Sequence, residues 1–189
     1  IITDLDNTLW GGIVGEDGVE NLIVERFGKG RPFAEYQKFL MEQKAKGIPI
    51  CVVSKNNPDD AISPFNSLQD LLIKSTDFLY FHASWGHKFE AIQSIVSKLN
   101  FSIEHACFID DTMQERDEAR KMMPGLIVPE IPEDPEKRVG FLHRSGLFWS
   151  PRLSEEDTNR VKYYEGDKKR RDEGKSSLNV KDYLQSLDM

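Results

Sequence analysis

Apolar residues in the first two thirds of the chain fall into short, nearly continuous runs separated by longer polar stretches. Such runs are typical of strands that are buried on both faces of a parallel sheet, whereas a strand with one face in water alternates apolar and polar residues. The pattern therefore predicts five strands, at residues 1–5, 48–53, 77–81, 106–109 and 126–128.

The stretches between these runs carry apolar side chains at helical spacing. Residues 88–99 show it best, with inward positions at Phe89, Ile92 and Ile95, among others. Alternating strands and helices favour an α/β fold, a Rossmann-like parallel sheet with helices on both faces. The helices are expected at residues 32–46, 61–72, 88–99 and 115–123.

The composition becomes highly charged from residue 154. We expect two helices there, at 154–173 and 178–187, and divide the chain into a catalytic domain, 1–150, and a helical tail packed on it, 151–189. The chain does not begin with methionine, so we expect a domain of a longer protein.

Charge and cysteine usage narrow the class of protein. The 189 residues include 25 Lys and Arg against 32 Asp and Glu, a net charge of -7 that argues against nucleic-acid binding. Cys51 and Cys107 both lie in apolar runs, so we expect buried free thiols and a reducing, cytoplasmic setting. No apolar run has the length of a membrane span, and the chain start lacks the features of a signal peptide.

Polar side chains that suit phosphate chemistry cluster at the predicted strand ends. In a parallel sheet, ligands bind beyond the carboxyl ends of the strands. Two aspartates one residue apart favour a hard cation such as Mg²⁺, and a phosphoryl group needs a metal, a cation and hydrogen-bond donors. The candidates are Asp4 and Asp6 after the first strand, Ser54, Lys55 and Asn56 after the second, Lys88 at a helix start, and Asp110 and Asp111 after the fourth.

Taken in order, these four elements resemble the motifs of the haloacid-dehalogenase superfamily of aspartate-dependent phosphotransferases. Residues 4–18, DLDNTLWGGIVGEDG, resemble more narrowly the FkbH-like group. Its other motifs are matched by Ser54-Lys55-Asn56, by Trp85 with Lys88, and by Phe108-Ile109-Asp110-Asp111 with Glu115-Arg116.

The resemblance implies an activity and its cofactor. FkbH-like proteins transfer the glyceryl group of 1,3-bisphosphoglycerate to the phosphopantetheine thiol of an acyl carrier protein, with Mg²⁺ and removal of phosphate, in polyketide-type biosynthesis. The alternative is a phosphomonoesterase of the same superfamily acting on a small metabolite or a phosphoprotein. A third possibility is a non-catalytic domain that docks a carrier, against which the intact motif residues argue.

Residue roles follow from the same resemblance. Asp4 would be the nucleophile or a phosphate-facing carboxylate, Asp6 the general acid and base, and Lys88 the cation that neutralises the phosphoryl group. The implied metal ligands are Asp4, the backbone carbonyl of Asp6, and Asp110 or Asp111. The implied substrate contacts are Trp10, Gly11, Gly12, Ser54, Lys55, Asn56 and Arg116. The alternative for Trp10 with its two glycines is a packing corner.

Two positions depart from the family pattern. Val53 stands where many relatives have a cysteine, which leaves Cys51 as the candidate nucleophilic thiol or, by its place within a strand, a core residue. His87 replaces a proline.

The basic run 168–171 is either a solvated helix face or a dock for an acidic carrier. The short segments after the first two strands predict a minimal cap and an open site.

Overall fold

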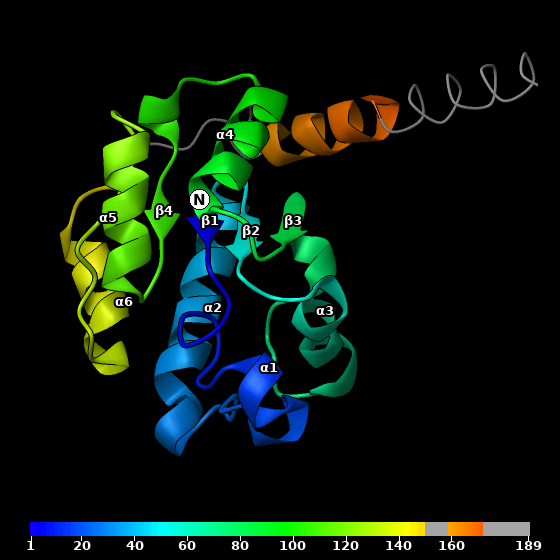
Figure 1. Ribbon diagram of the computed structural model, residues 1–189, viewed down its shortest axis with the longest axis vertical. Helices are drawn as coiled ribbons and strands as arrows, with labels where there is room; N and C mark the ends of the chain where they lie inside the picture. Colours follow the sequence, from blue (N-terminus) through cyan, green and yellow to red (C-terminus); the bar gives the residue numbers. More distant parts are fainter. Residues whose placement is uncertain (150–158, 172–189) are drawn as a thin grey trace, which may run out of the picture.

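Four parallel strands form the centre of the molecule in the order β3-β2-β1-β4 (Figure 1). The computed structural model describes residues 1–149 and 159–171. The strands are β1 (Ile2–Thr3), β2 (Cys51–Ser54), β3 (Tyr80–Ala83) and β4 (Phe108–Ile109). The chain proceeds outward from β1 to β3 and then returns to place β4 on the other side of β1. This reversal creates a crevice between β1 and β4, where α/β proteins commonly bind ligands.

Helices cover both faces of this sheet, as the sequence predicts. They are α1 (Val14–Asp17), α2 (Arg31–Ala45), α3 (Pro58–Ser67), α4 (Lys88–Leu99), α5 (Met113–Met122) and α6 (Pro135–Arg144), together with a helical segment at 159–171. Short 3₁₀ turns lie at Val19–Asn21, Gly28–Gly30, Ser75–Asp77 and Ile103–His105. No helix in the described part of the chain is long and apolar enough to cross a membrane.

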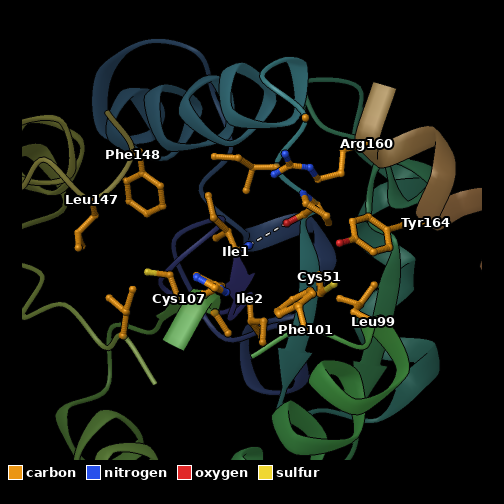
Figure 2. Close-up of a pocket in the computed structure, with 16 residues that line it drawn as sticks. Ile1, Ile2, Cys51, Leu99, Phe101, Cys107, Leu147, Phe148, Arg160 and Tyr164 are labelled. Atoms are coloured by element: carbon orange, nitrogen blue, oxygen red, sulfur yellow. Dashed lines mark hydrogen bonds between the residues drawn. The ribbon is translucent and has the colours of Figure 1, made fainter. Parts of the chain in front are cut away.

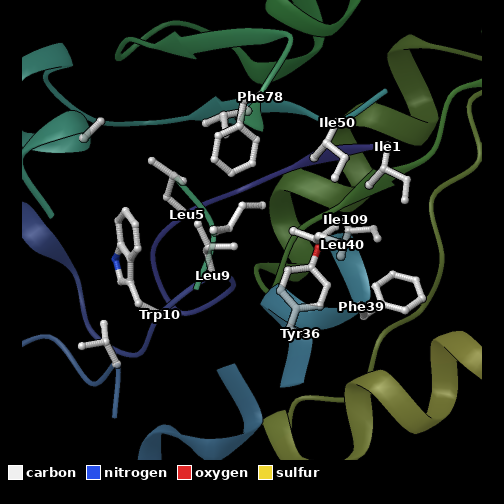
Figure 3. Close-up of a cluster of buried hydrophobic side chains, with 14 of the residues drawn as sticks. Ile1, Leu5, Leu9, Trp10, Tyr36, Phe39, Leu40, Ile50, Phe78 and Ile109 are labelled. Carbon is white, nitrogen blue, oxygen red and sulfur yellow. The ribbon is translucent and has the colours of Figure 1, made fainter. Parts of the chain in front are cut away.

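The alternation of side chains along the strands divides the core in two. Val52 points to the face covered by α2, α3 and α6, while Cys51 and Val53 point to the face covered by α4 and α5. Figure 3 shows the first cluster, in which Leu5 and Trp10 from the loop after β1 lie with the buried side chains of α2. The loop that carries the first two aspartates is therefore anchored in the core.

Most predicted elements are present, with shifted ends. The helix at 88–99 has the expected bounds. β2 begins later than expected, at Cys51, although the Pro49 carbonyl still accepts from the N-terminal amine of Ile1 at 2.8 Å. β3 begins at Tyr80 because a 3₁₀ turn, which the Asp77 side chain closes by accepting from the backbone N–H of Lys74, occupies the preceding residues.

Three expectations for the C-terminal third fare differently. The strand expected at 126–128 is reduced to one bridge, between Cys107 and Ile127. Helix α6 was not expected, because the prolines near it suggest a loop. The expected helix 154–173 is described only at 159–171, where the chain is helical, and the helix expected at 178–187 lies outside the described residues. The boundary at residue 150 stays a prediction.

The described residues contain no separate cap domain. Between β1 and α2 lie only α1 and two 3₁₀ turns, and between β2 and β3 only α3 and one such turn. This agrees with the minimal cap expected from the sequence, and it leaves the carboxyl edge of the sheet accessible.

Candidate active site

Three aspartates meet at the carboxyl edge of β1 and β4. Thr3 pairs in register with Ile109, and the backbone N–H of Asp4 donates to the Ile109 carbonyl at 3.0 Å. The next residues, Asp4 and Asp110, are therefore neighbours. Carboxylate oxygens of Asp4, Asp110 and Asp111 all lie within 4.8 Å of one another.

Lys88 places its ammonium between two of these carboxylates. Its Nζ is 2.9 Å from Oδ1 of Asp4 and 2.6 Å from Oδ2 of Asp110, and the side chain is 5% exposed. Burial by itself would lower the pKa of Lys88, but the charges of the two aspartates outweigh it and raise that pKa above its usual range. The lysine is therefore charged throughout the physiological range.

The two other carboxylates are held by backbone and hydroxyl groups. Asp110 Oδ1 accepts from the backbone N–H of Thr112 at 2.8 Å. Burial, together with the charge of Asp4, raises the pKa of Asp110 to about 7, against the opposing effect of Lys88. The Thr8 hydroxyl donates to Asp111 Oδ1 and accepts from the Asp111 backbone N–H, both at 3.1 Å. Burial also raises the pKa of Asp111.

Asp6 lies outside this three-carboxylate cluster, and three hydrogen-bond donors hold its carboxylate. Its Oδ1 accepts from Nε1 of Trp10 at 2.9 Å and from the backbone N–H of Val14 at 3.1 Å, and its Oδ2 accepts from Nδ2 of Asn56 at 2.8 Å. Burial raises the pKa of Asp6, partly offset by these hydrogen bonds. The loop bends at Asn7, whose φ of 51° is one that asparagine tolerates better than most residues.

Ser54 and Asn56 form a buried pair at the end of β2. Asn56 Nδ2 donates to the Ser54 oxygen at 3.1 Å, as well as to Asp6. Because its oxygen already accepts a hydrogen bond, the Ser54 hydroxyl can donate its own proton into the cleft. Asn56 is 1% exposed and therefore positions its neighbours rather than contacting a ligand.

A cleft of about 240 Å³ is lined by six of the predicted site residues, while Asp110 lies beneath it and is fully buried. Most of its lining is polar or charged. Lys55 and Glu115 form an ion pair of 2.5 Å within it, and Oε2 of Glu115 is buried without a hydrogen bond to any described residue. The lining residues are Asp4, Asp6, Asn7, Ile13, Glu16, Ser54, Lys55, Trp85, Lys88, Asp111, Thr112 and Glu115.

Five residues expected to contact substrate do not line this cleft, namely Asn56, described above, and the four that follow. Trp10 is completely buried and donates to Asp6, so it positions the acid. A side chain at Gly11 would lie 2.8 Å from the Phe33 ring, and Gly12 has a φ of 100° that favours glycine, so both residues serve the bend of the loop. Arg116 is buried and donates to the backbone carbonyls of Asp110 and Asp111, which fixes the end of β4.

The sequence interpretation assigned no role to three residues that support the site. Thr8 lies inside the first motif and holds Asp111. Glu115 was quoted only as part of a motif and lines the cleft. Arg138 on α6 donates to the carbonyl of Asn7 and so anchors the loop after β1. Only Thr8 carried a usable signal, since a hydroxyl two residues beyond Asp6 is well placed to hydrogen-bond a carboxylate of the site.

Cys51 is not near this cleft. It lies three residues before Ser54 on β2, about 10 Å along the strand, and lines a different cavity of about 410 Å³ at the opposite edge of the sheet. Figure 2 shows this cavity, with Cys51 and Cys107 on either side of Ile2 and with Tyr164 from the helical segment. Burial raises the pKa of both thiols, that of Cys107 to about 11. Both are free and buried, as expected, and the structure does not bring Cys51 to the site as a nucleophile.

The carboxylate cluster fits a divalent cation. Magnesium prefers oxygen ligands, and Asp4, Asp110 and Asp111 supply them from one edge of the sheet. These three carboxylates and the Lys88 ammonium leave a formal charge of -2 when all are ionised.

The chain is similar to a solved structure that contains a phosphatase domain. The crystal structure of the N-terminal part of the protein BF1531 from Bacteroides fragilis, which contains a phosphatase domain complexed with Mg, superimposes with a TM-score of 0.77 at 41% sequence identity. The match covers 79% of this chain and 40% of that chain. No protein-family model and no curated protein matched the chain. The chain therefore has the α/β fold of a haloacid-dehalogenase-like phosphatase, with the strand order given above.

Proposed function

We propose that this chain is a Mg²⁺-dependent phosphatase domain that cleaves phosphate monoesters with Asp4 as its nucleophile. The observation that carries this proposal is the cluster of Asp4, Asp110 and Asp111 at one edge of the sheet, with the buried ammonium of Lys88 between the first two. The similar structure supports it, since that protein contains a phosphatase domain complexed with Mg.

Asp4 and Asp6 divide the chemistry between them. An oxygen of Asp4 attacks phosphorus, the bond from phosphorus to the ester oxygen breaks, and the leaving oxygen takes a proton from Asp6. Water then attacks the phosphorus of the aspartyl phosphate and gives its proton to Asp6, which regenerates Asp4 and releases phosphate. The raised pKa of Asp6, caused mainly by burial, favours the protonated form that the first step requires.

The remaining cleft residues hold the phosphoryl group. A metal bound by Asp4, Asp110 and Asp111 would polarise that group and offset its charge. The Lys88 ammonium has three protons, of which two face the carboxylates of Asp4 and Asp110, so the third can reach a phosphoryl oxygen. Ser54 donates its hydroxyl from the end of β2.

Hydrolysis of p-nitrophenyl phosphate with and without Mg²⁺ tests this proposal. We expect activity that chelation abolishes, and Asp4→Asn is expected to lower kcat by about a thousandfold or more because it removes the nucleophile. Asp59→Asn is the matched control, since Asp59 is exposed on α3 and does not line the cleft. Equal activity of wild type and Asp4→Asn would contradict the proposal.

A second candidate is the glyceryl transfer implied by the FkbH-like resemblance. It is favoured by the absence of a cap domain among the described residues, because an open cleft admits the phosphopantetheine arm of a carrier protein. With no thiol beside the cleft, the carrier thiolate itself would attack the carbonyl carbon of 1,3-bisphosphoglycerate. The bond from that carbon to the phosphate oxygen breaks and phosphate leaves, while Asp4 removes the other phosphate.

The carrier's mass separates the two candidates. The chain is incubated with 1,3-bisphosphoglycerate, Mg²⁺ and a phosphopantetheinylated carrier protein, and the carrier is weighed. A glyceryl adduct that forms only with the enzyme supports transfer. Phosphate release without an adduct supports the phosphatase alone.

A further inference from the structure

Trp85 is an exposed indole held in a fixed orientation at the rim of the cleft. It follows β3 and is 66% exposed. Its Nε1 donates a 2.8 Å hydrogen bond to Oδ1 of Asn57 at the start of α3. The amide of Asn57 is oriented in turn, because its Nδ2 donates to Asp60 at 2.9 Å. The edge of the indole is thus fixed.

The loop that carries this indole is attached on both sides. The backbone N–H of Ser84 donates to the Ser54 carbonyl at 3.1 Å. At the other end, Nδ1 of His87 lies 2.8 Å from a carboxylate oxygen of Glu118 on α5. A ligand that packs on Trp85 therefore meets a side chain that is already ordered, which lowers the entropic cost of the contact.

The cleft has little other apolar surface. Of its lining residues, Ile13 and Trp85 alone have hydrocarbon or aromatic side chains, while the rest are polar or charged. The polar floor, which includes Asp4 and Lys88, suits a phosphoryl group. A group esterified to that phosphate must extend from the floor toward the rim, where Trp85 lies.

We propose that Trp85 is a specificity-determining residue that packs against the leaving group and selects phosphate compounds whose leaving group has a planar or apolar face near the ester oxygen. The inference rests on the phosphatase function proposed above and names the substrate class of the same cleft. Contact between an aromatic ring and such a group is expected to change affinity by about tenfold.

Binding of phosphonates tests this inference without turnover, because their carbon–phosphorus bond resists this reaction. We would measure Kd for benzylphosphonate and methylphosphonate in Mg²⁺ by calorimetry. The wild type is expected to bind benzylphosphonate about tenfold more tightly, and Trp85→Ala to bind both alike. Trp85→Phe keeps a ring and should retain most of the preference. Trp149→Ala, which removes an exposed tryptophan outside the cleft, should retain all of it.

Three results would each overturn the inference. The wild type could bind both phosphonates equally, it could bind neither, or its preference could survive Trp85→Ala. The proposed function fails separately. The wild type could prefer benzylphosphonate in a way that depends on Trp85 and yet hydrolyse no phosphate monoester. That result would support the role of Trp85 in binding and would contradict the phosphatase proposal.

Discussion

Replacing Lys88 by methionine is expected to destabilise the metal-free protein strongly. Lys88 Nζ lies 2.9 Å from Asp4 and 2.6 Å from Asp110, and all three side chains are buried. Methionine has a similar length and an apolar stem, so it preserves packing while removing the charge. The two carboxylates then stay buried without the ammonium between them.

The size of the effect follows from this burial. Removing one partner of a buried ion pair costs about 3–5 kcal/mol, because the remaining charge loses its compensation. In a domain of this size, 1 kcal/mol shifts Tm by about 2–4 °C, so Lys88→Met should lower Tm by about 10 °C. The same change should reduce phosphatase kcat by about a hundredfold or more, since the ammonium no longer stabilises developing charge.

Calorimetric unfolding in a chelator measures the stability effect. The double variant Lys88→Met/Asp110→Asn should recover part of the loss, with a coupling of about 1–3 kcal/mol, because it removes one of the two stranded charges. Lys38→Met serves as the control, since Lys38 is exposed on α2. A Tm of Lys88→Met within about 2 °C of wild type, with no recovery from Asp110→Asn, would refute the account of this buried network.

Three further predictions concern the same residues and the thiols. In a chelator, stability should fall as pH rises from about 4 to about 7, and Tm at several pH values checks this. The pKa of Asp110 in the folded chain is raised to about 7 and those of Asp6 and Asp111 are also raised, so the folded chain binds protons more tightly than the unfolded chain. Mg²⁺ should reverse the trend because it competes with protons for these carboxylates. Iodoacetamide should label neither cysteine in the folded protein and both in urea, as read by intact mass, and native labelling of Cys51 would contradict its buried placement. Asn56→Ala should lower kcat by about tenfold and move the Asp6 limb of the pH profile upward, because it removes a hydrogen bond that lowers the pKa of Asp6; an unmoved profile would count against this positioning role.

The elements of the fold were predictable because hydrophobic periodicity is a local property of the sequence. The apolar runs fixed the identity of the four strands, and parallel strands bring their carboxyl ends to one edge, which predicted that Asp4, Ser54 and Asp110 lie together. Lys88 could be assigned because it begins a helix whose spacing is unambiguous. These inferences require no knowledge of which side chains are buried.

Side-chain direction in the loop after β1 could not be read from the sequence. Trp10 beside two glycines suggests a ligand contact, yet the indole points into the core and holds Asp6. The direction depends on a partner distant in sequence, since Trp10 packs edge-on against Phe65 of α3 with ring centres 5.5 Å apart. No local pattern encodes that contact.

Helix α6 was missed for a different reason. Prolines around residues 129–135 suggest a loop, but Pro135 occupies the first turn of the helix, where its missing N–H costs nothing. Asp134 caps the same end by accepting from the backbone N–H of Glu136 at 3.0 Å. The helix matters to the site because Arg138 binds the carbonyl of Asn7.

The arrangement of cations around the carboxylates argues for a metal more strongly than the carboxylates alone. Two further basic residues lie close by, and each is engaged elsewhere. Lys55 pairs with Glu115 at 2.5 Å, and Arg116 binds the backbone carbonyls that follow β4 and the carboxylate of Glu130. Of these three side chains, only Lys88 forms an ion pair with carboxylates of the cluster, so the cluster keeps a formal excess of negative charge. In a buried site such an excess raises pKa values and costs stability, and a divalent cation removes both penalties at once.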